Sequence, residues 1–188
     1  LDTARRAQRI LSSPLFRVYI SEDVVGVELG GALKNIIALS AGMSDGLGYG
    51  DNSKSALITR GLAEISRLGV VMGANPFTFQ GLAGLGDLVT TCASPLSRNH
   101  YVGQELARGR KLDEIVSTMN GVAEGIRTVV VARKLARKLN VDMPILEQVY
   151  GVLYEGVSVM QAMRNLMERE PKCELVGYED YVPKSPIS

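Results

Sequence analysis

The sequence predicts a mainly helical fold, and three features of its pattern support this prediction. Apolar residues recur every three or four positions through most of the chain, as they do on the buried faces of helices. Glycine, proline, asparagine or a capping serine separates these runs. Only residues 15–20 are rich in β-forming side chains. The 188 residues, 46% of them hydrophobic, suffice for one domain, or for one domain and a piece of another.

The first 21 residues differ in character from the rest of the chain. Residues 3–11 are predicted as a basic amphipathic helix that ends at residues 12–14, and residues 15–20 as one strand. The N-terminus has no Met and no apolar signal-peptide core, so the chain is expected to start inside a domain. Because a lone strand needs a partner, residues 1–21 are interpreted as the end of a preceding α/β domain. Residues 22–188 are then a separate helical domain.

A buried helix is predicted for residues 24–39, where small residues at positions 30–32 would let another backbone or a ligand approach closely. The four glycines between residues 42 and 50 predict a loop. Asn52 or Ser53 can cap the helix that follows this loop.

That next helix has apolar residues at helical spacing from Leu57 to Met72, and the sequence GANP at residues 73–76 ends it. Further helices are predicted near residues 86–93, 98–108, 112–118, 124–139, 144–154 and 158–167. The residues from Pro171 onward are polar, contain proline and are predicted to form a tail.

Charge and composition exclude several classes of function. The net charge of +1 gives no general attraction to nucleic acid or to a membrane surface. Charged residues such as Glu28 and Lys34 interrupt the long apolar segments, so membrane insertion is not expected. The single histidine, His100, has no second histidine to share a metal ion with, and no GxSxG elbow accompanies it. Neither a metal site nor a serine hydrolase is therefore expected.

The two cysteines, Cys92 and Cys173, lie far apart in the sequence and form no CxxC pattern. This spacing favours a reduced, cytoplasmic protein. Cys92 is predicted to be a small buried hydrophobic residue rather than a reactive thiol.

Lys34 lies midway along an otherwise apolar helix, in the segment ELGGALKN at residues 28–35. A buried ammonium group is costly, and burial favours the neutral amine, so a lysine in such a place can exchange protons near neutrality. An equally strong alternative is a lysine that extends along the helix surface to reach water.

Asp87 follows a run of glycines in the segment GLAGLGDLVTTC at residues 81–92. The glycine spacing matches neither a phosphate-binding P-loop nor a dinucleotide fingerprint. Asp87 stands at a predicted helix start, where it can simply cap the helix. Alternatively, it orients a lysine such as Lys34 through a charge-assisted hydrogen bond.

Two further segments suit anionic or polar ligands. Ser97 suits a helix N-cap, and the free backbone N–H groups there, with Arg98 and the amide of Asn99, would suit a phosphate. The alternative is an ordinary capped helix with a solvated arginine. Glu124, in the segment AEG at residues 123–125, either caps a helix start or accepts hydrogen bonds from a ribose or an amide.

Taken in order along the chain, the segments ELGGALKNIIA, GLAGLGDLVTTC, SRN and AEG closely resemble the C-terminal domain of bacterial-type NAD(P)-dependent glycerol-3-phosphate dehydrogenases. The resemblance runs from about residue 16 to residue 170. It implies the multi-helical C-terminal domain of a two-domain enzyme similar to 6-phosphogluconate dehydrogenase. It also implies that residues 1–21 are a helix–strand remnant of an N-terminal Rossmann domain that binds NAD(P).

The activity that this resemblance implies is the reversible reduction of dihydroxyacetone phosphate to sn-glycerol 3-phosphate by NADH or NADPH. In the family, this cytoplasmic reaction serves glycerophospholipid synthesis, and the resemblance is compatible with a homodimer. The family's GxGxxG loop and a second lysine belong to the N-terminal domain. The chain is therefore expected to be inactive on its own.

The resemblance assigns substrate roles residue by residue. Lys34 matches the family's general acid–base, and Asp87 matches the residue that positions it. Asn35 and Thr91 match positions that contact the substrate.

The remaining matches concern the phosphate and the cofactor. Ser97, Arg98 and Asn99 match residues that hold the phosphate of the substrate. Arg98 also matches a cofactor contact, as do Val122 and Glu124. Hydride transfer places negative charge on a carbonyl oxygen, so a cationic donor beside it and a bound phosphate handle suit this reaction.

Two rival interpretations remain open. One is a dehydrogenase with the same two-domain plan that acts on a β-hydroxyacid or a sugar acid, against which the SRN and GLGD segments argue. The other is a non-catalytic helical dimerisation module, which has no reason to hold Lys34, Asp87 and Arg98 around one cleft. The choice between NAD and NADP depends on a residue in the Rossmann domain that reads the ribose 2′ position.

Overall fold

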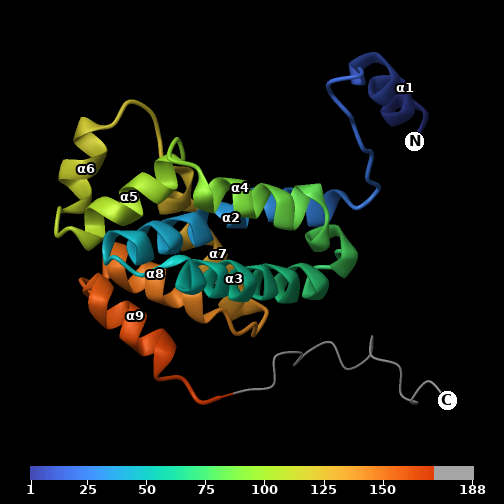
Figure 1. Ribbon diagram of the computed structural model, residues 1–188. Helices are drawn as coiled ribbons and strands as arrows, with labels where there is room; N and C mark the ends of the chain where they lie inside the picture. Colours follow the sequence, from blue (N-terminus) through green and yellow to red (C-terminus); the bar gives the residue numbers. More distant parts are fainter. Residues whose placement is uncertain (172–188) are drawn as a thin grey trace.

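Helix α2, Val24–Gly46, is the central element of the computed structural model, which describes residues 1–171 (Figure 1). Helices α3, α4, α5 and α7 all pack against it. The helices in chain order are Asp2–Leu11 (α1), Val24–Gly46 (α2), Asp51–Val71 (α3), Asp87–Ala93 (α4), Arg98–Ala107 (α5), Leu112–Thr118 (α6), Glu124–Lys138 (α7), Pro144–Tyr154 (α8) and Val159–Met167 (α9), with a 3-10 turn at Pro76–Gln80 (η1) and a π-helical turn at Leu82–Gly86 (η2). The prediction of a mainly helical fold is confirmed. Cys173 and the predicted polar tail, apart from Pro171, lie outside the described residues.

The predicted strand at residues 15–20 is wrong. Residues 13 and 16 exchange backbone hydrogen bonds of 2.8 and 3.2 Å in a tight turn, and the segment after them is not paired with any strand in the described part of the chain. β-Forming residues become a strand only beside another strand, and residues 1–171 offer none. Instead, Leu15 and Phe16 remain exposed, and α1 stands apart from the helical body (Figure 1).

The predicted loop at residues 42–50 is also wrong at its start, because α2 continues to Gly46. A Cβ atom at Gly42 would lie 2.0 Å from the carbonyl oxygen of His100 on α5. A Cβ atom at Gly103 on α5 would lie 2.1 Å from the carbonyl oxygen of Leu39 on α2. The glycines thus let the α2 and α5 backbones touch, and they do not break the helix. Helix α3 begins at Asp51 after an N-cap at Gly50, so neither Asn52 nor Ser53 is its cap.

By length and composition alone, α2 could cross a membrane, although the sequence analysis found no uninterrupted apolar run. Its 23 residues include a window of mean hydropathy 1.4, half of which is buried inside the fold. The apolar residues at positions 33, 36, 37 and 39 are each at most 3% exposed and form the core with residues of the surrounding helices. Packing against α3, α4, α5 and α7 therefore accounts for the apolar character of α2.

The start of α2 is tied to the segment that leads into α4. The carboxylate of Asp23 accepts hydrogen bonds from the Gly26 amide at 2.9 Å, the Thr78 hydroxyl at 2.6 Å and the Asn75 amide at 2.9 Å. These bonds, the one from Thr78 foremost, lower the pKa of Asp23. A Cβ atom at Gly30 would lie 2.4 Å from the carbonyl oxygen of Ala83, so η2 also lies directly on α2. Both contacts fix where α4 begins.

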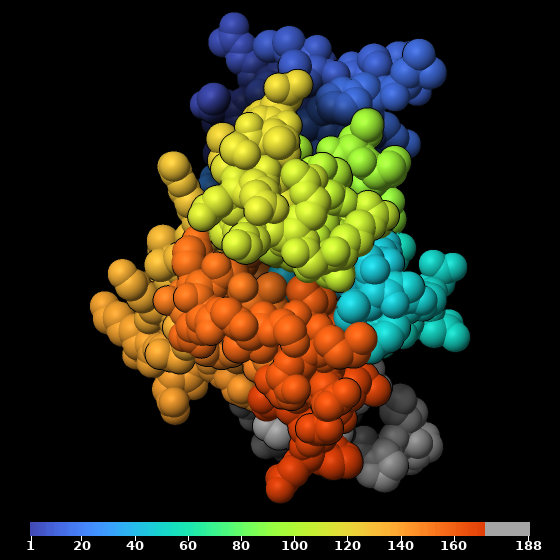
Figure 2. Space-filling view, turned by 90° about the vertical axis from the view of Figure 1, so that its left-hand side faces the viewer, coloured from blue at the N-terminus to red at the C-terminus, as the bar shows by residue number. Residues whose placement is uncertain are grey.

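The side of the molecule away from the start of α2 includes α5, α6, α8 and α9 (Figure 1). Figure 2 views this side, with the N-terminal segment at its upper end. A groove on this side has two walls. The connection from α5 to α6 forms one wall and the turn between α8 and α9 forms the other, and the lining includes Leu106, Leu112, Leu153 and Val157. None of the residues that the sequence analysis assigned to a site lines this groove.

Candidate functional site

The candidate site begins at two adjacent residues of α2, Lys34 and Asn35. The Lys34 ammonium lies 2.5 Å from both carboxylate oxygens of Asp87, the first residue of α4. The Lys34 side chain is 22% exposed and the Asp87 side chain 38% exposed. The ion pair therefore faces solvent, although Lys34 lies on the central helix. Its charge-assisted hydrogen bonds hold the ammonium group in one place.

Asp87 does not act as the cap of α4. Gly86 occupies the N-cap position, and no side-chain capping bond is present there. Instead, the π-helical turn η2 carries the chain over Gly30 of α2 and delivers the Asp87 carboxylate to Lys34, 53 positions earlier in the sequence. Of the two interpretations from the sequence, the structure has the contact with Lys34.

Thr91 lies one helical turn after Asp87. Its hydroxyl donates to the Asp87 carbonyl oxygen at 2.6 Å and lies 3.4 Å from the carboxylate oxygen Oδ1. This spacing places the Thr91 hydroxyl on the same face of α4 as the ion pair.

Asn35 leads to the second half of the site through Asn99 on α5. The Asn99 Nδ2 group donates to Asn35 Oδ1 at 2.9 Å, and Asn99 Oδ1 accepts from the Gly125 amide at 2.9 Å. Asn99 is 3% exposed, so its amide joins α2, α5 and α7 inside the fold. A Cβ atom at Gly125 would lie 2.7 Å from the Asn35 carbonyl oxygen and 2.8 Å from Asn99 Oδ1. Only glycine leaves room for this junction.

Ser97 caps α5, as predicted, by accepting a hydrogen bond from the His100 amide at 3.3 Å. Arg98 follows it, and its Nη2 group donates to Glu124 Oε1 at 2.9 Å. The side chains of Arg98 and Glu124 are 47% and 50% exposed, and Val122 is 57% exposed. Glu124 is the first residue of α7, whose N-cap is Ala123. Arg98, Glu124 and Val122 thus present polar and apolar groups to solvent.

The two halves of the site are joined through neighbouring residues. Lys34 precedes Asn35 on α2, and Arg98 precedes Asn99 on α5, and the two asparagines are hydrogen-bonded. One cation is therefore held by a carboxylate beside a hydroxyl, and a second is exposed at the start of a capped helix. The first suits proton transfer to an oxygen that gains charge, and the second suits an anionic group.

The sequence analysis missed a charged cluster beneath this site. His100 Nε2 lies 2.8 Å from Asp45 Oδ2, and the same oxygen lies 2.7 Å from the Lys54 ammonium. His100 was noticed only as the single histidine, and Asp45 fell in a predicted loop. Asp45 lies on α2, three residues after Gly42, and therefore on the face that contacts α5. The prediction of a loop at residues 42–50 is the reason that this placement was missed.

Two other groups are enclosed and take no part in the site. Cys92 is 0% exposed, and burial raises the pKa of its thiol to about 12, which confirms the prediction of a small buried residue. Glu64 on α3 is 1% exposed, and it accepts from the backbone amides of Ile145 and Leu146 at 2.8 and 3.3 Å. Nothing in the sequence analysis indicated Glu64, because its partners lie on α8.

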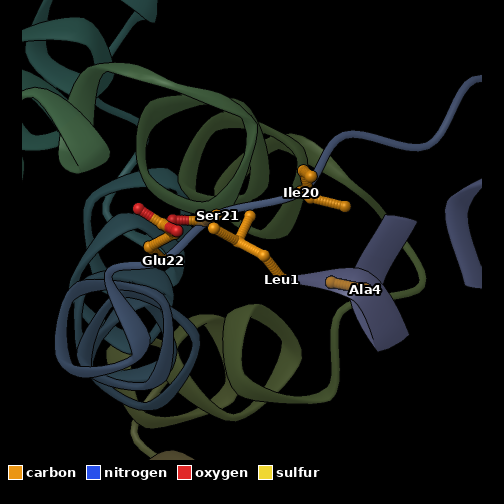
Figure 3. Close-up of a pocket in the computed structure, with 5 residues that line it drawn as sticks. All are labelled: Leu1, Ala4, Ile20, Ser21 and Glu22. Carbon is orange, nitrogen blue, oxygen red and sulfur yellow. The ribbon is translucent and has the colours of Figure 1, made fainter. Parts of the chain in front are cut away.

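A cavity of about 260 Å³ lies within the N-terminal segment, between the start of α1 and the residues just before α2 (Figure 3). Its lining consists of Leu1, Ala4, Ile20, Ser21 and Glu22. None of these side chains belongs to the candidate site. Across residues 1–171, no group of three His, Cys, Asp or Glu side chains could hold a metal ion.

Comparison with known proteins adds family relationships to this geometry. The profile of the family described as NAD-dependent glycerol-3-phosphate dehydrogenase C-terminus matches residues 23–164. A glycerol-3-phosphate dehydrogenase [NAD(P)+] of Geobacter metallireducens is 58% identical over 174 residues, which cover 93% of this chain and 52% of that protein. The enzyme of the same description from Prosthecochloris aestuarii is 54% identical, with 93% of this chain and 53% of the relative covered.

Solved structures show the same relationship. The crystal structure of glycerol-3-phosphate dehydrogenase from Coxiella burnetii matches with a TM-score of 0.86 and 41% identity, over 89% of this chain and 52% of that one. The Saccharomyces cerevisiae enzyme matches with a TM-score of 0.80 and 31% identity, over 88% and 48%. The chain thus spans about half the length of the curated relatives that it matches.

Proposed function

The chain belongs to the family of NAD-dependent glycerol-3-phosphate dehydrogenase C-terminal domains, and from this premise we propose that it supplies the substrate-binding half of such an enzyme. The reaction is the reversible reduction of dihydroxyacetone phosphate to sn-glycerol 3-phosphate with NADH or NADPH. The observation that carries the proposal is the Lys34 ammonium, which lies between both oxygens of Asp87 on the solvent-facing side of a central helix.

Lys34 is the general acid in the direction of reduction. When C2 of dihydroxyacetone phosphate accepts a hydride, its carbonyl oxygen gains negative charge, which a neighbouring ammonium group stabilises and then protonates. In the direction of oxidation, Lys34 takes the hydroxyl proton. Asp87 orients the ammonium group, Thr91 has a hydroxyl next to the Asp87 carboxylate, and Asn35, the residue after Lys34, carries an amide that is bonded to Asn99.

The turn formed by Ser97, Arg98 and Asn99 binds the phosphate group of the substrate, and Asn99, whose side-chain amide is bonded to Asn35 and Gly125, holds this turn in place. Ser97 places the free amides of the α5 N-terminus at the site, and Arg98 supplies a charged fork that suits phosphate oxygens. Arg98 is paired with Glu124 in this structure, so phosphate binding requires Arg98 to exchange this exposed partner. A bound phosphate lets binding energy orient the reacting carbon.

The cofactor, when bound, supplies the hydride. The resemblance implies that Arg98, Val122 and Glu124 contact the nicotinamide nucleotide. All three are about half exposed, and Glu124 is paired with Arg98, which also belongs to the turn at residues 97–99 that binds the phosphate. They offer an arginine, a carboxylate and an apolar surface. The nucleotide, NAD or NADP, is held mainly by residues outside this set.

The division into residues 1–21 and 22–188 is part of the proposal. Its support is that the family profile begins at residue 23 and that Asp23 caps α2. The segment before it carries exposed apolar side chains and stands apart from the helices (Figure 1). We assign this segment to the nucleotide-binding domain. A cytoplasmic location, a role in glycerophospholipid synthesis and a homodimer accompany the proposed activity and are part of the same hypothesis.

The test compares two preparations. One is the 188-residue chain, and the other is a fusion of this chain to the part of the Geobacter metallireducens relative that it does not cover. We expect the fusion to oxidise NADH or NADPH when dihydroxyacetone phosphate is added, and we expect the chain alone to show no turnover. A fusion that folds and binds reduced cofactor but acts only on a β-hydroxyacid or sugar acid would contradict the proposed substrate.

A further inference from the structure

We propose that His100 is a positioning residue for the phosphate-binding turn. Its ring holds the first turn of α5, which carries Ser97, Arg98 and Asn99, against α2 through Asp45. This inference rests on the proposed function, because the positioning serves the phosphate binding that the function assigns to this turn.

The contact between His100 and Asp45 is enclosed. The His100 side chain is 9% exposed and the Asp45 side chain 16% exposed, and the Nε2–Oδ2 distance is 2.8 Å. Because an ionised carboxylate only accepts hydrogen bonds, Nε2 is the donor. A shielded hydrogen bond to a charged group is among the stronger contacts that a side chain can make.

The backbone of His100 is held as firmly as its ring. A Cβ atom at Gly42 would lie 2.0 Å from the His100 carbonyl oxygen, so the two backbones are in direct contact. Gly42 and Asp45 are one turn apart and share a face of α2. The His100 amide in turn donates to the Ser97 hydroxyl at 3.3 Å. His100 is thus fixed to α2 at two points and to the cap of α5 at a third.

These contacts set the register between α5 and α2. Asn99, the residue before His100, bonds to Asn35 at 2.9 Å, and Arg98, the residue before Asn99, faces solvent. Asn35 lies seven positions before Gly42, which is two turns along the same face of α2. A tilt of α5 about the Gly42 contact would therefore move Asn99 away from Asn35 and displace Arg98. Small displacements of groups that orient a substrate are costly for binding.

The chain offers a matched control in Lys54. Asp45 Oδ2 accepts from both His100 at 2.8 Å and Lys54 at 2.7 Å. Lys54 lies on α3, which carries none of the assigned site residues, whereas His100 lies on α5, which carries Arg98 and Asn99 and is capped by Ser97. Removal of either side chain takes one partner from Asp45, but only removal of His100 loosens the phosphate-binding turn.

The experiment measures steady-state kinetics of the fusion protein with dihydroxyacetone phosphate and thermal unfolding of the same variants. In His100→Leu we expect the KM for dihydroxyacetone phosphate to rise about tenfold or more while kcat stays within about twofold, because Lys34 and Asp87 are untouched. In Lys54→Met we expect both constants to stay within about twofold, although both variants lose stability.

The conservative variants separate positioning from packing. His100→Gln retains an N–H donor that can reach Asp45 and should recover most of the KM effect. His100→Asn is one methylene shorter and should not. If His100→Leu fails to fold, this Gln and Asn pair carries the test. An equal KM in the Gln and Asn variants, or a KM rise in Lys54→Met as large as in His100→Leu, contradicts the positioning role. A wild-type fusion without turnover of dihydroxyacetone phosphate contradicts the proposed function instead.

Discussion

Asp87 and Glu64 are both carboxylates that join one helix to another, and they do so in opposite surroundings. Asp87 is more than a third exposed, and its partner is the ammonium group of Lys34. Glu64 is 1% exposed, and its hydrogen-bond partners are the backbone amides of Ile145 and Leu146 at the start of α8. Burial raises the pKa of Glu64 to about 7, and the hydrogen bonds from the two amides oppose this rise only in part.

The contrast distinguishes Asp87, which with Lys34 is accessible to a substrate, from Glu64, which stabilises the fold. Helix α8 has Met143 at its N-cap and no side-chain cap of its own, so Glu64 from α3 accepts from amides that would otherwise be unpaired. No ligand can reach that carboxylate. Lys34 and Asp87 face solvent, where a substrate can approach. Substitutions at the ion pair should therefore change catalysis, and substitutions at Glu64 should change stability.

The largest expected effect is that of Lys34→Ala on turnover. In the fusion protein, kcat should fall by about a hundredfold or more, which is the range for loss of a general acid. Lys34→Arg should not restore it, because arginine stays protonated. Thermal unfolding should shift little, since partly exposed ion pairs contribute only about 0–1 kcal/mol. Substantial turnover by Lys34→Ala, measured as reduced cofactor consumed with dihydroxyacetone phosphate, would remove Lys34 from the mechanism.

The next effect concerns substrate preference and sharpens the same contrast within the site. Arg98→Ala should reduce the preference for dihydroxyacetone phosphate over dihydroxyacetone by about tenfold or more, the loss expected when a charged hydrogen bond is removed. The measurement is the ratio of kcat/KM for the two substrates. Arg137→Ala is a matched control, because Arg137 forms an exposed ion pair with Glu147 and has no assigned role. An unchanged ratio in Arg98→Ala contradicts phosphate binding by this arginine.

Much of the fold could be predicted from local signals. Helices α5, α6 and α8 match their predicted ranges to within a residue, because a capping serine, a proline at the first turn or a following glycine marks their ends. The errors fall where the deciding partner is distant in sequence. The glycines at positions 42 and 46 of α2 led to the prediction of a loop, because their close contact with the α5 backbone is not visible in the sequence. Residues 15–20 have the composition of a strand, but no other strand is present among residues 1–171 to pair with them.

The same limit applies to the candidate site. The contact between Lys34 and Asp87 could be anticipated, since a lysine in an apolar helix needs a carboxylate and Asp87 stands at a helix start. The bridge from Asn35 through Asn99 to Gly125 could not, because it depends on how three helices cross. The functional roles of these residues came from the family resemblance and stay predictions that the kinetic experiments test.

At the other carboxylate, Glu64→Ala should destabilise the chain by about 1–3 kcal/mol, because it leaves two buried amides without an acceptor. Glu64→Gln is the control, since its amide oxygen can still accept from Ile145, and it should cost less. Denaturant unfolding of the 188-residue chain, followed by helical circular dichroism, measures both. In the fusion, kcat should change little in either variant. A large loss of kcat with unchanged stability would place Glu64 in the catalytic machinery and break the comparison with Asp87.

The smallest expected effect is the pH dependence that Glu64 gives to stability. Its pKa is about 7 in the folded chain, against an ordinary value of 4.5, so between these values the folded state holds a proton that the unfolded state has released. Stability falls with rising pH wherever the folded state binds more protons. The contribution of protonated Glu64 is therefore fully present below about pH 4.5 and is lost as the pH rises to about 7.

The variant Glu64→Gln isolates this contribution, because its side chain cannot titrate. In the difference between the free energies of unfolding of the wild type and Glu64→Gln, the contributions of the other titrating groups cancel. We expect the free energy of unfolding of the wild type to fall relative to that of Glu64→Gln between about pH 4.5 and 7, and the difference to be constant at higher pH. A difference that is flat, or that moves in favour of the wild type over this range, would show that the amides of Ile145 and Leu146 outweigh burial and keep Glu64 ionised.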